Sequence, residues 1–395
     1  MTVSRVHVDL GTRSYPVVVG HGVVGEIDSL LPKTAKRAVI VTQKEIGFVV
    51  KPKIDSTTVL IGNGEQHKNL QTIEMLSQKF AEFGLTRNDV VIGLGGGMVT
   101  DVAGFAAASW HRGTPVLHVS TSLVGMVDAA IGGKTGVNID QGKNLVGAFW
   151  QPCAVVCDLD ALKTLPEREM RCGLGEVAKY HFLTGDDLLA LEMPQRIARC
   201  VEIKAKIVAA DERESGGRAL LNYGHTLAHA LERSSNFSLA HGEAVAVGMI
   251  YAAHLAHAMQ RISQARVEEH YKIIGQTYGL KVKPDDRVNR KELIELMRHD
   301  KKAISGLTFV LLYFLLGKTS LLVGASGAIM ALLIASATYA PFMLLRIPLI
   351  GIVKLWHVAF VILLVDLIQL PLENMGGHLA HLGGAFFGFI YIKLI

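Results

Sequence analysis

Charge is scarce in this chain, and one end has almost none. Charged residues make up only 19% of the 395 residues, whereas hydrophobic residues make up 50%. Charges recur steadily from Met1 to Lys302 and nearly vanish from Ala303 to Ile395. The chain therefore has two parts of different character, and its length allows two or three domains with sizeable cores.

Three other features are missing, and each absence excludes a class of protein. The formal net charge of +5 is spread out without a Lys/Arg block, so we expect no nucleic-acid partner. The four cysteines form no paired framework, which indicates buried thiols in a reducing compartment. No apolar segment follows the first basic residue, so we expect no signal peptide.

The first part alternates between strand-like and helix-like patterns. Short β-branched runs at 39–42, 58–61, 90–94 and 116–119 are separated by helical periods such as 70–83. This alternation predicts an α/β domain with a Rossmann-like parallel sheet. After about Leu165 helical periods dominate, at 169–182, 195–211, 218–234 and 241–260, and predict a second, all-α domain.

The tail predicts membrane helices. No charge occurs between Lys318 and Arg346, a run longer than the roughly 20 apolar residues needed to cross a bilayer. A second apolar run, 355–372, contains only Asp366 as a charge, and a third covers 374–392. We therefore expect three transmembrane helices, with buried helices of a soluble core as the alternative.

The predicted domains are 1–157, 158–312 and 313–395.

A glycine-rich turn follows the predicted strand 90–94. Gly95, Gly96 and Gly97 lead through Met98-Val-Thr-Asp101 into a helix of small residues, 102–109. Glycines let backbone amides approach a pyrophosphate, and a helix N-terminus attracts negative charge. The pattern predicts a phosphate or dinucleotide site, although it is not the strict G-x-G-x-x-G fingerprint and a tight structural turn is the alternative.

A stripe of polar residues is expected on one helix. Arg218, Asn222, His225 and His229 are spaced by four, three and four, which places them on one helical face. These four side chains would be left without hydrogen-bond partners if they packed against apolar neighbours. A metal ion together with an anionic ligand would provide partners for them. Glu176 lies in an earlier expected helix, and His241 begins a later one. Two histidines and one glutamate are a common catalytic set for zinc, so these groups together predict a metal site with an open coordination position.

Two lysines lie among glycines between the turn and the stripe. Lys134 follows Gly132 and Gly133, and Lys143 follows Gly142. Lysines held in this way suit a phosphate or a carboxylate, whereas solvated glycine-rich turns are the alternative.

In this order, the segments of residues 5–312 closely resemble 3-dehydroquinate synthase. The matching motifs are Gly-Gly-Gly with Asp101, Phe105-Ala-Ala-Ala-Ser109, Arg112-Gly113, Gly-Gly-Lys134-Thr, Gly-Lys143-Asn144, Leu162-Lys-Thr-Leu-Pro166, Gly-Glu176-Val-Ala-Lys179, Ala-Ala-Asp211-Glu-Arg-Glu214, the 218–229 stripe and His241-Gly-Glu-Ala. Related alternatives are other sugar-phosphate cyclases, such as 2-deoxy-scyllo-inosose synthase, and polyol dehydrogenases, such as glycerol dehydrogenase.

The resemblance implies a set of site residues. It implies zinc or cobalt on Glu176, His225 and His241. A phosphorylated seven-carbon sugar acid would lie among Asp128, Lys134, Asn144, Lys179, Lys204, Arg218, Asn222, His229, Lys302 and Arg112, the last reaching into a neighbouring subunit of a homodimer. NAD would lie along Glu65, Lys68, Gly95, Gly96, Gly97, Asp101, Thr121, Ser122, Lys143 and Thr164. Ser120-Thr-Ser-Leu123 stands where the family usually has Pro-Thr-Thr-Leu.

The implied reaction is a carbon–oxygen lyase reaction of aromatic biosynthesis. NAD would take a hydride from C5 of the substrate while the C5 hydroxyl loses its proton beside the metal, and the resulting ketone acidifies a neighbouring C–H so that phosphate leaves. The hydride then returns, the ring opens and an aldol step closes the carbocycle. NAD is unchanged at the end. We expect this part of the chain to lie in the cytoplasm.

The tail, 313–395, resembles the last three core helices of a rhomboid intramembrane serine protease. Gly324-Ala-Ser326-Gly327 and Ala380-His381-Leu-Gly-Gly384 carry the resemblance, which implies Ser326 as nucleophile and His381 as its base. The family's earlier helices, which supply oxyanion donors, have no counterpart here. We therefore expect little or no proteolysis.

The join between the two parts is unusual. After Leu312 the synthase family normally continues with closing helices, and the expected membrane orientation of the tail conflicts with a cytosolic synthase. A gene fusion or a misassembled gene sequence would explain this. A membrane protein with an inert synthase portion is the remaining alternative.

Overall fold

The computed structural model describes most of the first part and short pieces of the tail. The described residues are 3–214, 216–235, 238–284, 289–298, 333–334, 336–339, 342, 344–347, 351–369, 382–383, 385–386 and 389. The chain divides into two compact units, Met1–Met297 and Arg298–Ile395.

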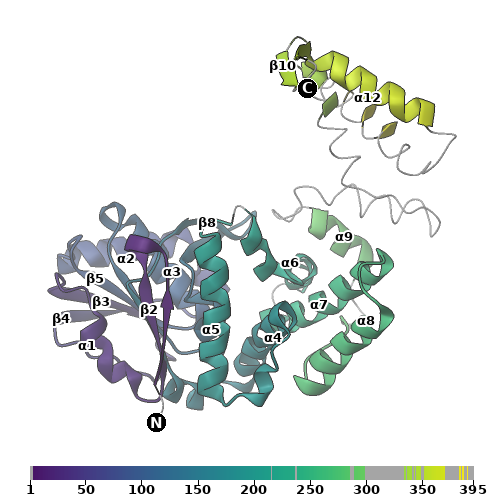
Figure 1. Ribbon diagram of the computed structural model, residues 1–395. Coiled ribbons are helices and arrows are strands. Elements are labelled where there is room, and N and C mark those ends of the chain that lie inside the picture. The colour runs from purple at the N-terminus through teal and green to yellow at the C-terminus, as the bar shows by residue number, and fades with distance from the viewer. Residues whose placement is uncertain are drawn as a thin grey trace. The chain divides into compact units, whose positions relative to one another are not determined.

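A seven-stranded sheet forms the centre of the first unit (Figure 1). Its strands lie in the order β1-β2-β9-β6-β5-β3-β4. Their bounds are β1 Ser4–Val8, β2 Tyr15–Gly20, β3 Arg37–Thr42, β4 Asp55–Leu60, β5 Val90–Gly95, β6 Val116–Ser120 and β9 Ala154–Asp158. Only β1 and β2 pair antiparallel, and every other pair is parallel. The predicted Rossmann-like parallel sheet is confirmed.

Both faces of the central strands β3, β5, β6 and β9 are buried, as expected for parallel strands. Successive residues of β3 point to opposite faces, so Val39 and Val41 pack under α2 (Leu70–Phe83) and α3 (Gly97–Ser109). Ala38 and Ile40 pack on the other side, with α1 (Ile27–Leu30) and the 3-10 turn η2 (Val23–Glu26). β5, which leads into the glycine turn, is buried along its whole length.

Helices dominate after the sheet, as the sequence predicts. They are α4 Glu167–Thr184, α5 Met193–Ala210, α6 His225–Ser234, α7 His241–Ala258, α8 Gln264–Tyr271 and α9 Arg290–Arg298. Short 3-10 or π turns connect the elements, at η1 Gly11–Arg13, η3 Glu65–His67, η4 Trp110–Arg112, η5 Gly125–Ala129, η6 Leu159–Thr164, η7 Leu188–Ala190, η8 Gly217–Asn222 and η9 Lys272–Thr277. In Figure 1, α5 lies between the sheet and the group formed by α4, α6, α7 and α8.

Glycines allow α7 to pack very closely against two neighbours. A Cβ added to Gly242 of α7 would lie 1.9 Å from the carbonyl oxygen of Cys172 in α4. A Cβ on Gly248 would lie 2.0 Å from the carbonyl oxygen of Gly224, just before α6. Only glycine permits these backbone contacts, and they bring the starts of α6 and α7 next to α4.

The prediction of one continuous helix over 218–234 is wrong. The segment forms the 3-10 turn η8, then a break at Tyr223 and Gly224, then α6. Gly224 has φ +79°, and a Cβ there would lie 2.7 Å from the backbone nitrogen of Met249. The close approach of α7 therefore forces the break, so Arg218 and Asn222 do not share a helix with His225.

An antiparallel hairpin projects from the sheet domain and was not predicted from the sequence. It consists of β7 (Lys134–Ile139) and β8 (Gly142–Phe149). Strands β1, β2 and β9 were also missed. The four cysteines are free, three of them buried and Cys153 partly so, which confirms the interpretation as thiols without disulfides.

The described pieces of the tail differ in part from the predicted helices. The end of the first apolar run is a strand, β10 (Leu344–Ile347), which pairs antiparallel with β11 (Gly351–Lys354). The second run begins a helix at the predicted residue, α12 (Leu355–Gln369). Among the residues that the structure describes, no helix is long and apolar enough to cross a membrane. Most of the first and third runs lies outside the described residues.

The buried His118 should make the stability of the fold depend on pH. His118 on β6 is 3% exposed and its Nδ1 has no hydrogen-bond partner. Burial lowers the pKa of His118 to about 4. The unfolded chain takes up a proton below about pH 6.5, whereas the folded chain does not until about pH 4. We therefore expect the free energy of unfolding to fall across this window, by on the order of 3 kcal/mol.

The His118→Leu variant isolates this contribution. Urea denaturation at a series of pH values between 7.5 and 4 gives the free energy of unfolding at each pH. As the pH falls, this free energy should decrease less steeply in the variant than in the native chain. His7→Leu, at an exposed position of β1, is the matched control and should leave the slope unchanged. Equal slopes for the native chain and His118→Leu would contradict the assignment.

Candidate metal and nucleotide site

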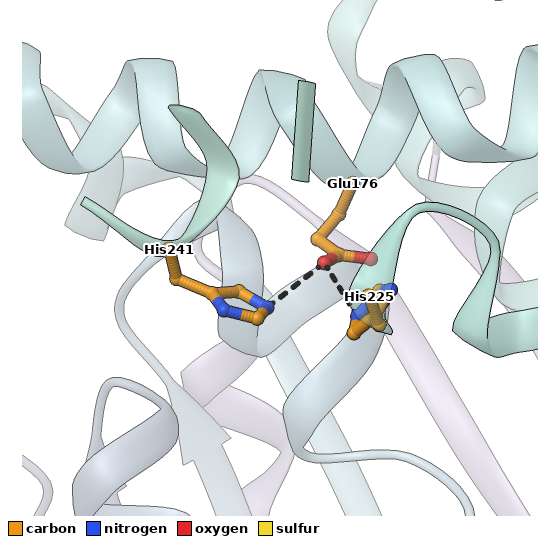
Figure 2. A group of neighbouring side chains, drawn as sticks. All are labelled: Glu176, His225 and His241. Atoms are coloured by element: carbon orange, nitrogen blue, oxygen red, sulfur yellow. Dashed lines mark hydrogen bonds and ion pairs between the residues drawn. The ribbon is translucent and has the colours of Figure 1, made fainter. Parts of the chain in front are cut away.

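Three side chains from three helices converge at the start of α6 and α7 (Figure 2). Glu176 of α4 is fully buried, and its Oε1 lies 3.2 Å from Nε2 of His241 and 3.6 Å from Nε2 of His225. One ligand atom from each residue lies within 4.8 Å of the other two. The close packing of α7 through Gly242 and Gly248 makes this convergence possible.

The second nitrogen of each imidazole also has a partner. His225 Nδ1 lies 3.1 Å from the carbonyl oxygen of Tyr223, and His241 Nδ1 lies 3.3 Å from Oε2 of Glu232. Both partners accept hydrogen bonds, so each ring presents Nε2 toward Glu176. Outer-shell acceptors of this kind orient histidine ligands in metal sites.

This donor set fits a divalent metal. Two imidazoles and one carboxylate form a common catalytic zinc set that leaves a position open for substrate. Burial opposes ionisation of Glu176, but Lys179, His241 and His225 together outweigh it and lower the pKa of Glu176 to about 2. The carboxylate is therefore charged, as a ligand must be.

A group of charged residues adjoins the three ligands. Lys179, one turn after Glu176, is 1% exposed and forms an ion pair with it. Lys204 Nζ of α5 lies 2.6 Å from Asp128 Oδ1, and Lys179 Nζ lies 3.7 Å from the same oxygen. Burial would raise the pKa of Asp128, but the two lysines hold it well below its usual range. Two cations thus share one carboxylate beside the ligands.

Further cationic groups lie on the hairpin and on η8. Arg218 is 1% exposed, and its Nη2 donates to the carbonyl oxygen of Gly132 at 2.8 Å. Glu214 accepts from Lys134 Nζ at 2.6 Å and from Asn222 Nδ2 at 2.7 Å. Burial lowers the pKa of Lys134, while Glu214 opposes the shift. The structure therefore brings together Arg218, Asn222 and Lys134, although not by the single helical face that the sequence suggested.

The glycine turn lies between β5 and α3. Gly95 ends β5, and its carbonyl oxygen accepts from the backbone nitrogen of Thr121 at 3.0 Å. A Cβ on Gly96 would lie 3.0 Å from Ser122 Oγ. The predicted cofactor residues Gly95 to Gly97, Thr121 and Ser122 therefore form one group at the carboxyl end of the sheet, where open α/β sheets bind ligands.

A second group of predicted cofactor residues lies next to the hairpin. Lys68, 4% exposed, forms an ion pair with Asp101 of α3. The carbonyl oxygen of Lys68 accepts from the backbone nitrogen of Asn138 at 2.8 Å, and Asn138 Nδ2 donates to Glu65 Oε2 at 2.7 Å. Lys143 Nζ lies 3.9 Å from the same Glu65 oxygen.

Comparison with known proteins agrees with this geometry. Residues 58–172 match the family model of the 3-dehydroquinate synthase N-terminal domain, and residues 173–303 match that of the C-terminal domain. The chain belongs to the 3-dehydroquinate synthase family. A family member from Mycobacterium leprae, named 3-dehydroquinate synthase, is 41% identical over 320 residues, 75% of this chain and 88% of its own length.

Other similar proteins carry different names. A protein of Amycolatopsis mediterranei, provisionally named an aminodehydroquinate synthase, is 49% identical over 309 residues, 78% of this chain and 88% of its own length. A crystal structure of 2-deoxy-scyllo-inosose synthase with carbaglucose-6-phosphate, NAD+ and Co2+ has a TM-score of 0.69 at 25% identity and covers 75% of this chain and 89% of its own.

A third comparison shows a zinc-bound relative. The 2-epi-5-epi-valiolone synthase of Streptomyces hygroscopicus, with NAD+ and Zn2+ bound, has a TM-score of 0.62 at 26% identity and covers 72% of this chain and 84% of its own. In the tail, residues 302–395 match the model of the rhomboid domain, in agreement with the resemblance noted in the sequence.

The remaining predicted synthase residues are placed as follows. His229 lies beside His225, with ring centroids 5.6 Å apart, and the backbone nitrogen of Asn144 donates to Asn138 Oδ1 at 2.9 Å. Among the described residues, Arg112 of η4 and Thr164 of η6 make no hydrogen bond or ion pair with the other predicted residues. Lys302, Ser326 and His381 lie outside the described residues.

Two glutamates in the site were not predicted from the sequence. Glu214 contacts Lys134 and Asn222, and Glu232 contacts His241 and Lys143. The sequence carries a signal for Glu232, because positions 225, 229 and 232 share one face of a helix. For Glu214 no helical spacing gives a signal, but it ends the family motif Ala-Ala-Asp211-Glu-Arg-Glu214, which could have marked it.

Proposed function

We propose that this chain is a 3-dehydroquinate synthase, which converts 3-deoxy-D-arabino-heptulosonate 7-phosphate to 3-dehydroquinate and phosphate in aromatic biosynthesis. One observation carries the proposal. Glu176, His225 and His241 converge beside a group of buried cations, in a family member that also has the glycine turn after β5. A metal, an anionic sugar phosphate and a dinucleotide would each find suitable partners there.

The cations would bind the two anionic groups of the substrate. The side chains of Lys134, Arg218 and Asn222 would hold the phosphate or the carboxylate, since guanidinium and ammonium groups form strong charge-assisted hydrogen bonds with both. Glu214 now pairs with Lys134 and Asn222, and an incoming anion would compete with it for them.

Glu176, His225 and His241 would hold the metal, zinc or cobalt, and NAD would lie along the glycine turn and the Lys68 and Lys143 side chains. Bound together, the two groups supply Lewis-acid polarisation of a hydroxyl and a reversible hydride acceptor. Lys179 and Lys204 keep Asp128 ionised next to the metal ligands, so this carboxylate would accept a hydrogen bond from a substrate hydroxyl. Lys179 and Lys204 are buried, whereas the Asp128 side chain is 23% exposed and can be reached by a substrate.

Phosphate release in the presence of catalytic NAD tests the proposal. The purified full-length chain with zinc or cobalt should release one phosphate per substrate consumed, with NAD far below the substrate concentration and no lasting NADH. Steady accumulation of NADH on a polyol would instead indicate a dehydrogenase. No phosphate release from any sugar phosphate would reject the synthase function.

A second candidate is a related cyclase that acts on an aminated substrate. It is favoured by the 49% identity to the Amycolatopsis mediterranei protein and its name. The discriminating measurement is the ratio of kcat/KM for the hydroxyl substrate and for an analogue with an amino group in place of one hydroxyl. A higher kcat/KM for the amino analogue than for the hydroxyl substrate would favour this second candidate.

A pH dependence follows if Lys204 acts as a cation in the site. Burial lowers the pKa of Lys204 to about 8, while Asp128 opposes the shift. We therefore expect kcat/KM for phosphate release to fall above about pH 8, as the ammonium loses its proton and Asp128 loses a partner. Arginine stays protonated throughout this range, so Lys204→Arg should move the alkaline limb to higher pH. Lys206→Arg, at an exposed position of the same helix, should not move it.

We also propose that the tail associates with a membrane and that the synthase portion forms a homodimer. The match to the rhomboid domain supports the first, and the apolar composition of 303–395 agrees with it. Flotation of the full chain with lipid vesicles tests membrane association, and light scattering in detergent tests the dimer. Recovery in the aqueous fraction alone, or a monomeric mass, would reject the respective proposal.

A further inference from the structure

We infer that Glu232 couples the binding of the metal to the binding of NAD. The inference rests on the proposed function, because it takes Glu176, His225 and His241 as metal ligands and Lys143 as a nucleotide contact. Glu232 would touch neither group directly. It is a positioning residue that links one protein side chain from each site.

Glu232 uses its two carboxylate oxygens for two different partners. Oε2 lies 3.3 Å from Nδ1 of His241, and Oε1 lies 3.2 Å from Nζ of Lys143. The Glu232 side chain is only 6% exposed, and that of Lys143 is 25% exposed. A buried carboxylate needs such partners, because an unpaired buried charge is costly.

The two partners belong to different parts of the fold. His241 begins α7 and its other nitrogen faces Glu176, whereas Lys143 lies on β8 of the hairpin. On the far side, Lys143 lies 3.9 Å from Glu65, which also accepts from Asn138. A continuous series of contacts therefore runs from the metal ligands through Glu232 to the loop expected to hold NAD.

A bound metal ion would fix the positions of the His241 ring, the Glu232 carboxylate and the Lys143 side chain relative to one another. With Nε2 of His241 on the metal, the ring must keep its proton on Nδ1, and that proton is donated to Glu232. The polarised ring is then a stronger donor and holds the carboxylate in place. The second oxygen consequently holds Lys143, so less side-chain freedom is lost when the nucleotide binds.

The coupling must be reciprocal. If metal tightens NAD binding by some factor, NAD tightens metal binding by the same factor. Typical couplings of this kind are about 5- to 150-fold, and we expect roughly tenfold here, because one ordered lysine contributes only part of the nucleotide's affinity. Glutamine should not replace Glu232, since one of the two oxygens becomes an NH2 group, and this donor would then face either Lys143 or His241, which are donors themselves.

Equilibrium binding to the full-length chain tests the inference without any turnover. The Kd of NAD is measured by calorimetry with chelator-treated protein and with zinc-loaded protein, and the affinity for zinc is measured by competition with a chromophoric chelator. In the native chain zinc should lower the Kd of NAD about tenfold. In Glu232→Gln the two Kd values should agree within about twofold, and zinc affinity should fall by about 10- to 100-fold.

Two further variants separate the coupling from a general loss of structure. Glu243→Gln is the matched control, because Glu243 of α7, like Glu232 of α6, uses its two oxygens for two partners, with Oε1 3.1 Å from Arg171 and Oε2 3.8 Å from Lys281. It should retain the tenfold effect of zinc. Lys143→Met removes the other end of the bridge, so it should abolish the coupling while leaving zinc affinity without NAD unchanged.

The outcomes distinguish this inference from the proposed function. If the native chain binds zinc and NAD independently, or if Glu232→Gln and Lys143→Met keep the coupling, the inference is overturned while the synthase function stands. If the native chain binds neither zinc nor NAD, the proposed function fails first. Coupling lost in both variants and kept in Glu243→Gln supports the role of Glu232.

Discussion

Replacing His225 with alanine should abolish metal retention and turnover together. The variant leaves only Glu176 and His241 as ligands, and it removes an imidazole whose Nε2 lies 3.6 Å from the buried carboxylate. Loss of an outer-shell partner typically costs 10- to 100-fold in metal affinity, so the loss of a direct ligand should cost more than about 100-fold. Phosphate release should then fall to background at ordinary zinc concentrations.

Metal analysis of dialysed protein, together with the phosphate assay, checks this result. His254→Ala is a suitable control, because His254 is exposed on α7 and lies away from the three ligands, with its Nε2 3.0 Å from the hydroxyl of Tyr271. Circular dichroism should show that both variants are folded. Added zinc should raise the Tm of the native chain and of His254→Ala but not of His225→Ala. A full equivalent of zinc retained by His225→Ala would reject the assignment of ligands.

Replacing Gly242 with alanine should strongly lower the free energy of unfolding. The added Cβ would lie 1.9 Å from the carbonyl oxygen of Cys172, a backbone atom that cannot rotate away. Overpacking of a core usually costs about 1–3 kcal/mol, and a backbone clash between two helices should exceed about 3 kcal/mol. The forced separation of α4 and α7 would also move His241 away from Glu176.

Urea denaturation and metal analysis of the same preparation test both consequences. Gly25→Ala is the control, because a Cβ at Gly25 would meet nothing within 4 Å. It should change the free energy of unfolding by less than about 0.5 kcal/mol. A loss below about 1 kcal/mol in Gly242→Ala, with zinc retained, would show that α7 can shift without disturbing the site.

Local patterns predicted much of the fold because they report which residues must be buried. The β-branched runs at 39–42, 90–94 and 116–119 became β3, β5 and β6, and the period of 70–83 became α2 within the same bounds. These segments pack on both faces of the sheet, and their sequences are hydrophobic for that reason. Strands β7 and β8 were missed because they carry the glycines and lysines of the site, which weaken any strand pattern.

The residue types of the site were also visible in the sequence, whereas their connections were not. Glu176, His225 and His241 could be singled out as candidate ligands by residue type and by family resemblance. The break at Gly224 and the contact between Gly242 and Cys172 depend on the approach of α7, which involves residues far apart in the chain. Sequence spacing therefore identified the polar residues of the site but wrongly placed Arg218, Asn222 and His225 on one continuous helix.

The sequence by itself determined the order of elements, the glycine turn and the set of charged and imidazole side chains, because burial and backbone geometry act on neighbouring residues. Only the tertiary structure decided which charges pair. Glu232 lies between His241 and Lys143, and Glu214 between Lys134 and Asn222. Such pairs depend on distances of a few ångströms between segments that no local pattern relates, and the cost of burying charge selects the partners once the helices and the hairpin have packed.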